Sequence, residues 1–165
     1  MVEVILRAVR VDVGSSTPLL LLEEVGGNRV LPIFIGAPEA TAIAYALQEV
    51  VAPRPMSHDL LGNVITALGA KVFAVEIIEL VDNTFYASLR LIAGEREIVV
   101  SARPSDAVAL ALRVKAPILV ADDLMEAEGQ VYVREDEDDE DPDEDSLLAE
   151  LRDFLDTVRP EDFDQ

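Results

Sequence analysis

The chain has 165 residues, half of them hydrophobic and 28% charged, which is enough for one sizeable core and predicts a single folded domain. It contains no cysteine, which excludes disulfides, thiolate metal sites and a cysteine nucleophile. No apolar run approaches the roughly 20 residues that a membrane helix needs. We therefore expect a cytoplasmic protein with no membrane partner.

The net charge of −20 is concentrated near the C-terminus. Residues 1–134 hold 17 acidic and 11 basic side chains, a net charge of −6, whereas residues 135–165 hold 16 and 2, a net charge of −14. Tight nucleic-acid binders gain affinity when Lys and Arg release counterions from phosphates. The composition therefore argues against a high-affinity DNA or RNA binder, and less strongly against a hydrolase that must release its product.

Six longer strands and one short strand are predicted. The first three span residues 3–13, 17–25 and 29–35, with hairpin turn residues at Gly26, Gly27 and Asn28. Three more span residues 71–81, 84–92 and 96–102, with turns at Asp82-Asn83 and Gly94-Glu95. Ala87, Leu89 and Leu91 alternate with Ser88 and Arg90, which indicates one dry and one wet face. Residues 117–121 are expected to form the short buried strand.

Three main helices interrupt these strands. The first begins after Gly36, with Pro38 at its start and apolar residues repeating as far as Val51. The second is predicted to begin at Ser57 as N-cap and to close at Gly69, with an apolar face made by Leu60, Leu61, Val64, Ile65 and Leu68. The third runs from Pro104 to about Val114 and is apolar almost all round. A single turn is expected at residues 122–126.

These elements predict an α+β fold, with a mixed or antiparallel sheet of about six to seven strands and three main helices. The folded domain is expected to span residues 1–134, followed by an acidic, disordered linker at 135–145. Residues 146–165 are predicted to contain an amphipathic helix that could dock on the domain, bind a protein partner or pair in a dimer. The acidic linker could also repel nucleic acid and act as an autoinhibitory mimic.

Four segments carry a resemblance to a known family: LPIFIGAPE at 31–39, PRPMSHDLL at 53–61, DNTFYASL at 82–89 and SARPSDAVALAL at 101–112. In order and spacing they resemble the bifunctional nuclease family, which is named for DNase and RNase activity reported for some members. The resemblance covers about residues 2–128. It implies a nuclease that meets DNA or RNA as a transient substrate. We also expect a homo-oligomer, such as a dimer.

Two helix starts share one pattern. Glu39 and Asp106 are each followed by Ala-x-Ala-apolar-Ala-apolar, and each comes after a strand and a proline. Small residues let helices approach closely, which would bring the two carboxylates together within one chain or across a dimer interface. Chance similarity between Ala-rich helices is the alternative.

His58 is the one histidine of the chain and is followed by Asp59. An imidazole can act as general base or acid near neutral pH, and Asp59 could orient it or bind a metal. The alternative is that Ser57 and Asp59 cap a helix and His58 occupies a surface position.

Glu39, Asp59 and Asp106 place carboxylates at three predicted helix starts. Taken singly, each is explained by the positive end of a helix dipole. Taken together, they offer the oxygen ligands that Mg²⁺ or Mn²⁺ uses in phosphodiester hydrolysis.

Four further residues are candidates for substrate contacts. Arg54, between two prolines, and Arg103, before Pro104, could each clamp a phosphate, with Ser105 donating to the same group. The alternatives are an Arg103–Asp106 ion pair and a capping role for Ser105. Asn83 could contact substrate or simply form a turn.

Two function classes are consistent with these residues. The first is a weak, metal-assisted nuclease in which His58 is the general base or acid, Glu39, Asp59 and Asp106 bind the metal, and the arginines hold phosphate. The second is a non-catalytic regulatory module that uses the same pocket for a small anionic ligand or a protein partner. Acidity and the lack of a compact catalytic motif favour the second class, whereas the family resemblance favours the first.

Overall fold

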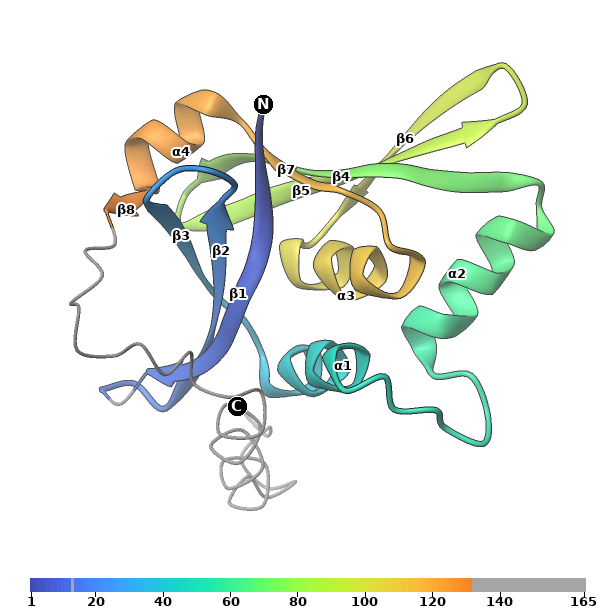
Figure 1. Ribbon diagram of the computed structural model, residues 1–165, viewed down its shortest axis with the longest axis horizontal. Helices are drawn as coiled ribbons and strands as arrows, with labels where there is room; N and C mark the ends of the chain where they lie inside the picture. Colours follow the sequence, from blue (N-terminus) through green and yellow to red (C-terminus); the bar gives the residue numbers. More distant parts are fainter. Residues whose placement is uncertain (13, 132–165) are drawn as a thin grey trace.

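The computed structural model describes residues 1–12 and 14–131. These residues form one eight-stranded sheet in the order β6-β5-β4-β7-β1-β2-β3-β8, with four helices beside it (Figure 1). The strands are β1 (Val2–Asp12), β2 (Thr17–Glu24), β3 (Arg29–Phe34), β4 (Ala70–Val81), β5 (Thr84–Ala93), β6 (Arg96–Ala102), β7 (Ile118–Val120) and β8 (Gln130–Val131). The predicted α+β class is confirmed, and the sheet contains one strand, β8, that the sequence did not predict.

Strand β7 joins two antiparallel meanders into one sheet. It pairs antiparallel with β1, where Val2 lies opposite Val120, and parallel with β4, where Val75 lies opposite Ile118. All other pairings are antiparallel. The parallel pairing requires a crossover from β6 to β7, and a helix of 11 residues supplies it.

That crossover helix, α3 (Pro104–Val114), lies at the centre of the helical layer. It packs against α1 (Ala37–Leu47), α2 (Ser57–Ala67) and strands β4 and β5 (Figure 1). Its buried residues include Ala107, Val108, Leu110 and Ala111, as the nearly uniform apolar pattern predicted. The small alanines let α1 and α3 approach closely, so their N-terminal ends are near one another.

Several element boundaries differ from the predictions. The first helix ends at Leu47 because Gln48 caps it and Glu49 adopts a left-handed conformation, so Val51 lies outside it. Ser57 is the first residue of α2, and the N-cap is Met56. The fourth helix, α4 (Asp122–Glu128), is longer than the expected single turn.

The apolar face predicted for α2 is only partly covered. Ile65 is buried, whereas the remaining apolar residues of the pattern are exposed, namely Leu60, Leu61, Val64 and Leu68. The helix ends as predicted at Gly69, which has a φ of 74° that favours glycine.

Among the described residues, no helix combines the length and the apolar character needed to cross a membrane. The predicted acidic linker at 135–145 and the amphipathic helix within 146–165 lie outside the described residues.

Candidate functional site

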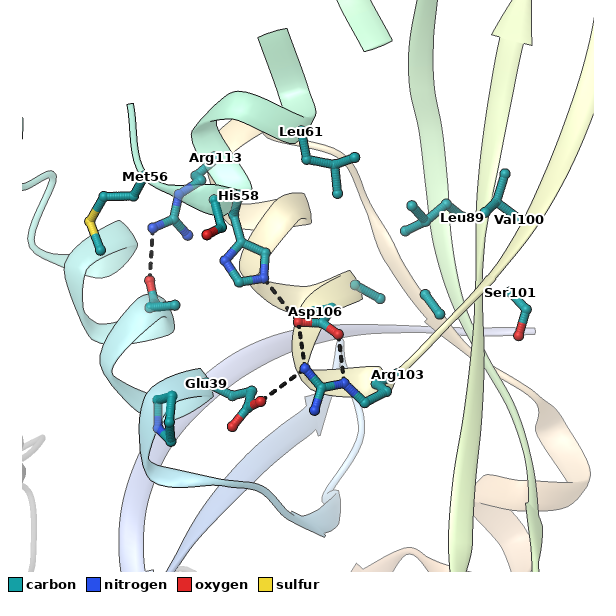
Figure 2. Close-up of a pocket in the computed structure, with 15 residues that line it drawn as sticks. Glu39, Met56, His58, Leu61, Leu89, Val100, Ser101, Arg103, Asp106 and Arg113 are labelled. Carbon is teal, nitrogen blue, oxygen red and sulfur yellow. Dashed lines mark hydrogen bonds and ion pairs between the residues drawn. The ribbon is translucent and has the colours of Figure 1, made fainter. Parts of the chain in front are cut away.

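A pocket of about 670 Å³ opens between the three longer helices and the β5–β6 hairpin. Figure 2 shows its two sides: Leu61, Leu89 and Val100 form an apolar wall, and charged side chains gather opposite. The charged lining residues are Glu39, His58, Arg103, Asp106 and Arg113. Four of them were predicted from the sequence, and their grouping here is a result of the tertiary fold.

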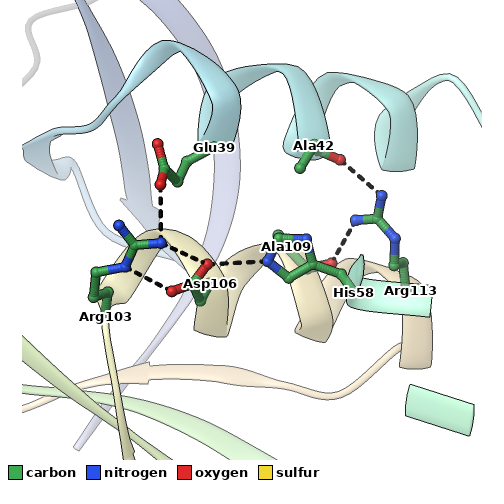
Figure 3. Close-up of polar contacts among 7 residues, drawn as sticks. All are labelled: Glu39, Ala42, His58, Arg103, Asp106, Ala109 and Arg113. Atoms are coloured by element: carbon green, nitrogen blue, oxygen red, sulfur yellow. Dashed lines mark hydrogen bonds and ion pairs between the residues drawn. The ribbon is translucent and has the colours of Figure 1, made fainter. Parts of the chain in front are cut away.

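Arg103 joins the starts of α1 and α3. Its Nη2 lies 2.9 Å from Glu39 Oε1, its Nε donates to Asp106 Oδ2 at 2.7 Å, and Nη2 also donates to Asp106 Oδ1 at 3.2 Å (Figure 3). The sequence pattern shared by the starts of α1 and α3 predicted that their carboxylates lie close together, and they do so within one chain. The predicted Arg103–Asp106 ion pair also forms.

His58 reaches the same carboxylate from α2. Its Nε2 is 3.1 Å from Asp106 Oδ1, so Asp106 receives contacts from both His58 and Arg103 (Figure 2). Burial raises the pKa of Asp106, but the hydrogen bonds from Arg103 and His58 outweigh it, and the net pKa lies below the ordinary value. Because an ionised carboxylate only accepts, the Nε2 of His58 must carry the shared proton, which leaves Nδ1 as the basic nitrogen of the neutral ring.

Asp59 serves a different part of the site. Its Oδ2 accepts a hydrogen bond from the Met56 backbone N–H at 2.9 Å, and its Oδ1 accepts one from Arg113 Nε at 2.5 Å. The Met56 N–H contributes most to lowering the pKa of Asp59, against a rise from burial, and Arg113 lowers it further. Asp59 therefore fixes the start of α2 to α3, and Asp106 is the carboxylate that contacts the imidazole.

Arg113 is the site residue that the sequence reasoning missed. Besides Asp59, its guanidinium donates to the Ala109 carbonyl at 2.8 Å and to the Ala42 carbonyl at 3.0 Å (Figure 3). It thereby connects α1, α2 and α3 at the wall of the pocket. A basic residue in the last turn of an otherwise apolar, buried helix was the available signal, since a buried Arg needs partners.

Three predicted contact residues lie elsewhere. Asn83 and Ser105 line a neighbouring pocket of about 270 Å³, which also contains Glu39 and Arg103. Asn83 and Asp82 both have positive φ and form the β4–β5 hairpin turn, while Ser105 is buried at 6% exposure. Arg54 is exposed and lines neither of these two pockets.

The three predicted metal-binding carboxylates do not form one ligand set. The guanidinium of Arg103 lies between Glu39 and Asp106, and Asp59 is held by Met56 and Arg113. Within residues 1–12 and 14–131, no group of three or more His, Asp or Glu side chains could hold a metal ion. The residues of this arrangement therefore do not fit the Mg²⁺ or Mn²⁺ site expected from the sequence.

The arrangement instead offers an acid–base group beside a cation. His58 supplies a basic nitrogen, and the side chain of Arg103 is 65% exposed at the pocket. Among the described residues, none accepts a hydrogen bond from Nη1 of Arg103, since Nε and Nη2 make its contacts. Such a pair can position an anionic group and move a proton next to it.

Comparison with known proteins agrees with the sequence resemblance. The pattern of the bifunctional nuclease domain matches residues 20–132. An uncharacterized protein of Mycobacterium tuberculosis strain H37Rv is 43% identical over 172 residues, covering 98% of this chain and 97% of that protein. Bifunctional nuclease 1 of Oryza sativa subsp. japonica is 31% identical over 105 residues, covering 62% of this chain and 32% of the rice protein. Bifunctional nuclease 2 of Arabidopsis thaliana is 29% identical over 114 residues, covering 67% and 35%. The chain belongs to the bifunctional nuclease domain family.

Proposed function

We propose that this protein is a nuclease that hydrolyses phosphodiester bonds of single-stranded DNA or RNA in the pocket between α1, α2, α3 and the β5–β6 hairpin. The observation that carries the proposal is the contact of His58 and Arg103 with one carboxylate, Asp106, at the pocket wall. The names of the plant relatives, which are nucleases, support the same reaction class.

His58 is the proposed general base. Asp106 accepts the Nε2 proton and so favours the tautomer with a free electron pair on Nδ1. That nitrogen would take a proton from the attacking water, or from a ribose 2′-hydroxyl in RNA, and return a proton to the leaving oxygen. General acid–base catalysis of this kind contributes roughly 10²- to 10⁴-fold to a rate.

Arg103 is the proposed phosphate contact. Glu39 and Asp106 hold its guanidinium through Nε and Nη2, so Nη1 is available to a phosphate oxygen. A fixed donor that carries positive charge is well suited to the charge that develops in the transition state. The apolar wall would meanwhile contact a base or sugar of a flexible strand.

Assistance by a divalent metal ion is tested through the dependence of the cleavage rate on Mg²⁺ or Mn²⁺. The carboxylates at the pocket wall are paired with Arg103, and no catalytic step is assigned to a metal.

The first prediction concerns cleavage by purified protein. Labelled single-stranded DNA and RNA are incubated with Mg²⁺, with Mn²⁺ and with chelator, using wild type, His58→Ala and Arg103→Ala. Both substitutions are expected to lower the rate at least about 100-fold, because each removes a group that contacts the reacting phosphodiester. Loss of wild-type activity in chelator would establish metal dependence, and full activity in chelator would exclude it.

Arg54→Ala is the matched control for Arg103→Ala, because Arg54 is an exposed arginine outside the pocket lining. We expect it to change the rate less than 10-fold, and circular dichroism should show that every variant is folded. Equal cleavage rates for wild type and His58→Ala would contradict the proposal and indicate a contaminating nuclease. Binding of oligonucleotide without cleavage would favour the non-catalytic module.

A further inference from the structure

We propose that a second copy of this chain pairs with β6 along its open edge and places its own Arg96 at the pocket of the first copy. The edge strand β6 alone supports the pairing. The role of Arg96 rests on the proposed function, because it supplies the pocket with a second cation for phosphate.

The two edges of the sheet differ. Within the described residues, the edge strand β8 has two residues and the edge strand β6, on the other side of the sheet, has seven (Figure 1). Every residue of β6 except Ala102 is exposed, including the apolar run Ile98, Val99 and Val100 at 38%, 58% and 40%. Natural sheets protect open edges with prolines, lysines, bulges or short strands. The middle of β6 has none of these protections, so its exposed backbone is suited to strand addition.

The sequence of β6 is complementary to itself. In an antiparallel pair with a two-fold axis at Val99, Val99 faces its own copy and Ile98 faces Val100, so the three apolar residues meet only one another. Glu97 then faces Ser101 and Arg96 faces Ala102, which puts no like charges opposite each other. An axis at Ile98 would instead place Glu97 against Val99 and Arg96 against Val100. Self-pairing with the two-fold axis at Val99 is therefore the favoured register. The partner strand at this edge is accordingly β6 of a second copy of the chain.

This register brings Arg96 to the pocket. Within β5–β6, Arg96, Val100 and Ala102 lie opposite Ala93, Leu89 and Ala87, so their side chains are on the face of the sheet that lines the pocket. Residues directly opposite in a sheet point to the same face. The Arg96 of the second copy, opposite Ala102, would therefore stand beside Arg103 at the pocket wall.

Within the described residues Arg96 makes no ion pair, and it is exposed in the single chain. Its arrival would add positive charge to a pocket in which Glu39 and Asp106 already hold the guanidinium of Arg103. Pairing would thus add a basic side chain to the pocket of a chain that is acidic overall.

The pairing is tested with a cysteine, since the chain has none of its own. Val99→Cys places two thiols opposite one another at the axis, within reach of a disulfide. Under mild oxidation it is expected to form a covalent dimer, whereas Val51→Cys, at a position that is 92% exposed, is the matched control. Sedimentation should show a dimer for wild type and a monomer for Val99→Lys, with Val51→Lys unchanged. A monomeric wild type, or Val99→Cys that crosslinks no faster than Val51→Cys, would overturn the pairing.

The role of Arg96 is tested by mixing two variants. Arg96→Ala and Arg103→Ala homodimers are each expected to bind a labelled single-stranded oligonucleotide at least 10-fold more weakly than wild type. After exchange of subunits, the mixed dimer contains one site with Arg103 and the partner's intact Arg96, so about a quarter of all sites regain wild-type affinity. Recovery of this size supports the shared site, and no recovery overturns it.

The two proposals fail in different ways. A wild-type protein that crosslinks through position 99 but neither binds nor cleaves oligonucleotide retains the pairing and loses the nuclease function. A protein that cleaves as a monomer retains the nuclease function and loses the pairing.

Discussion

At the scale of single residues, Asp106 is the centre of the site. Its carboxylate accepts two hydrogen bonds from Arg103 and lies 3.1 Å from the His58 Nε2. Burial alone would favour the protonated acid, but these donors favour the ionised form, and the pKa falls below the ordinary value. The same hydrogen bonds hold the imidazole and the guanidinium in place, so one carboxylate determines the geometry of both proposed functional groups.

The lowered pKa of Asp106 predicts a dependence of stability on pH. A carboxylate whose pKa is lower in the folded state stabilises it above the unfolded pKa of about 3.9, and the contribution is lost as pH falls through the folded pKa. We expect wild type to exceed Asp106→Asn in unfolding free energy by about 1 kcal/mol at pH 7, with the difference shrinking below pH of about 4. Urea unfolding at several pH values measures it.

Asp123→Asn is the control for this experiment, because Asp123 is exposed in the first turn of α4. Its unfolding free energy should differ little from that of wild type at each of these pH values. A difference for Asp106→Asn that stays constant down to pH of about 2.5 would contradict the linkage.

At the scale of elements, the approach of α2 to α3 determines where His58 lies. Gly62 is on the contacting face of α2, and a Cβ there would lie 3.3 Å from Val114 Cγ1 and 3.7 Å from Leu110 Cδ1. The lack of a side chain thus lets the helices approach closely. Arg113 and Asp59 hold them at this separation.

A larger side chain at position 62, which does not line the pocket, is therefore expected to change the geometry of the site by moving α2. Gly62→Leu should force α2 away from α3, lower the unfolding free energy by about 1–3 kcal/mol and weaken the His58–Asp106 contact, with a loss of cleavage. Thermal unfolding and the cleavage rate are the measurements. Asn63→Leu, at an exposed position on the same helix, should leave both nearly unchanged. A stable and fully active Gly62→Leu variant would contradict this dependence.

At the scale of the whole molecule, charge is distributed very unevenly. Residues 135–165 carry a net charge of −14, against −6 for residues 1–134. Negative charge attached to a domain repels a polyanionic strand over a distance set by the ionic strength, about 10 Å at 0.1 M salt. The charge of residues 135–165 would therefore oppose the proposed binding of nucleic acid by the pocket.

Deletion of residues 135–165 is expected to strengthen oligonucleotide binding or raise nuclease activity at low salt. The gain should shrink as salt is added, because screening removes the repulsion in the full chain. Titrations of both proteins at low and high salt provide the measurement. An unchanged or lower affinity after deletion would show that the tail has no autoinhibitory effect.

The local sequence was sufficient to predict the position of most strands and helices. Alternation and turn residues predicted the six longer strands to within one residue at each end, because one side of each hairpin must be apolar and its turn needs special backbone angles. Pro104 and the apolar run after it predicted α3 with the observed bounds. β8 was missed because a two-residue strand is defined only by its partner, β3. The pattern identified the apolar face of α2, but periodicity shows only which side is apolar and not whether another element covers it.

For the site, the sequence by itself determined which side chains are present: one histidine, carboxylates at helix starts and an arginine at a strand-to-helix junction. Only the tertiary structure decided their partners. His58 contacts Asp106, 48 residues away, and its neighbour Asp59 contacts Arg113, 54 residues away. Side chains at consecutive positions of a helix point in different directions, so sequence adjacency could not show which carboxylate the imidazole meets. The packing of α2 against α3 makes that choice.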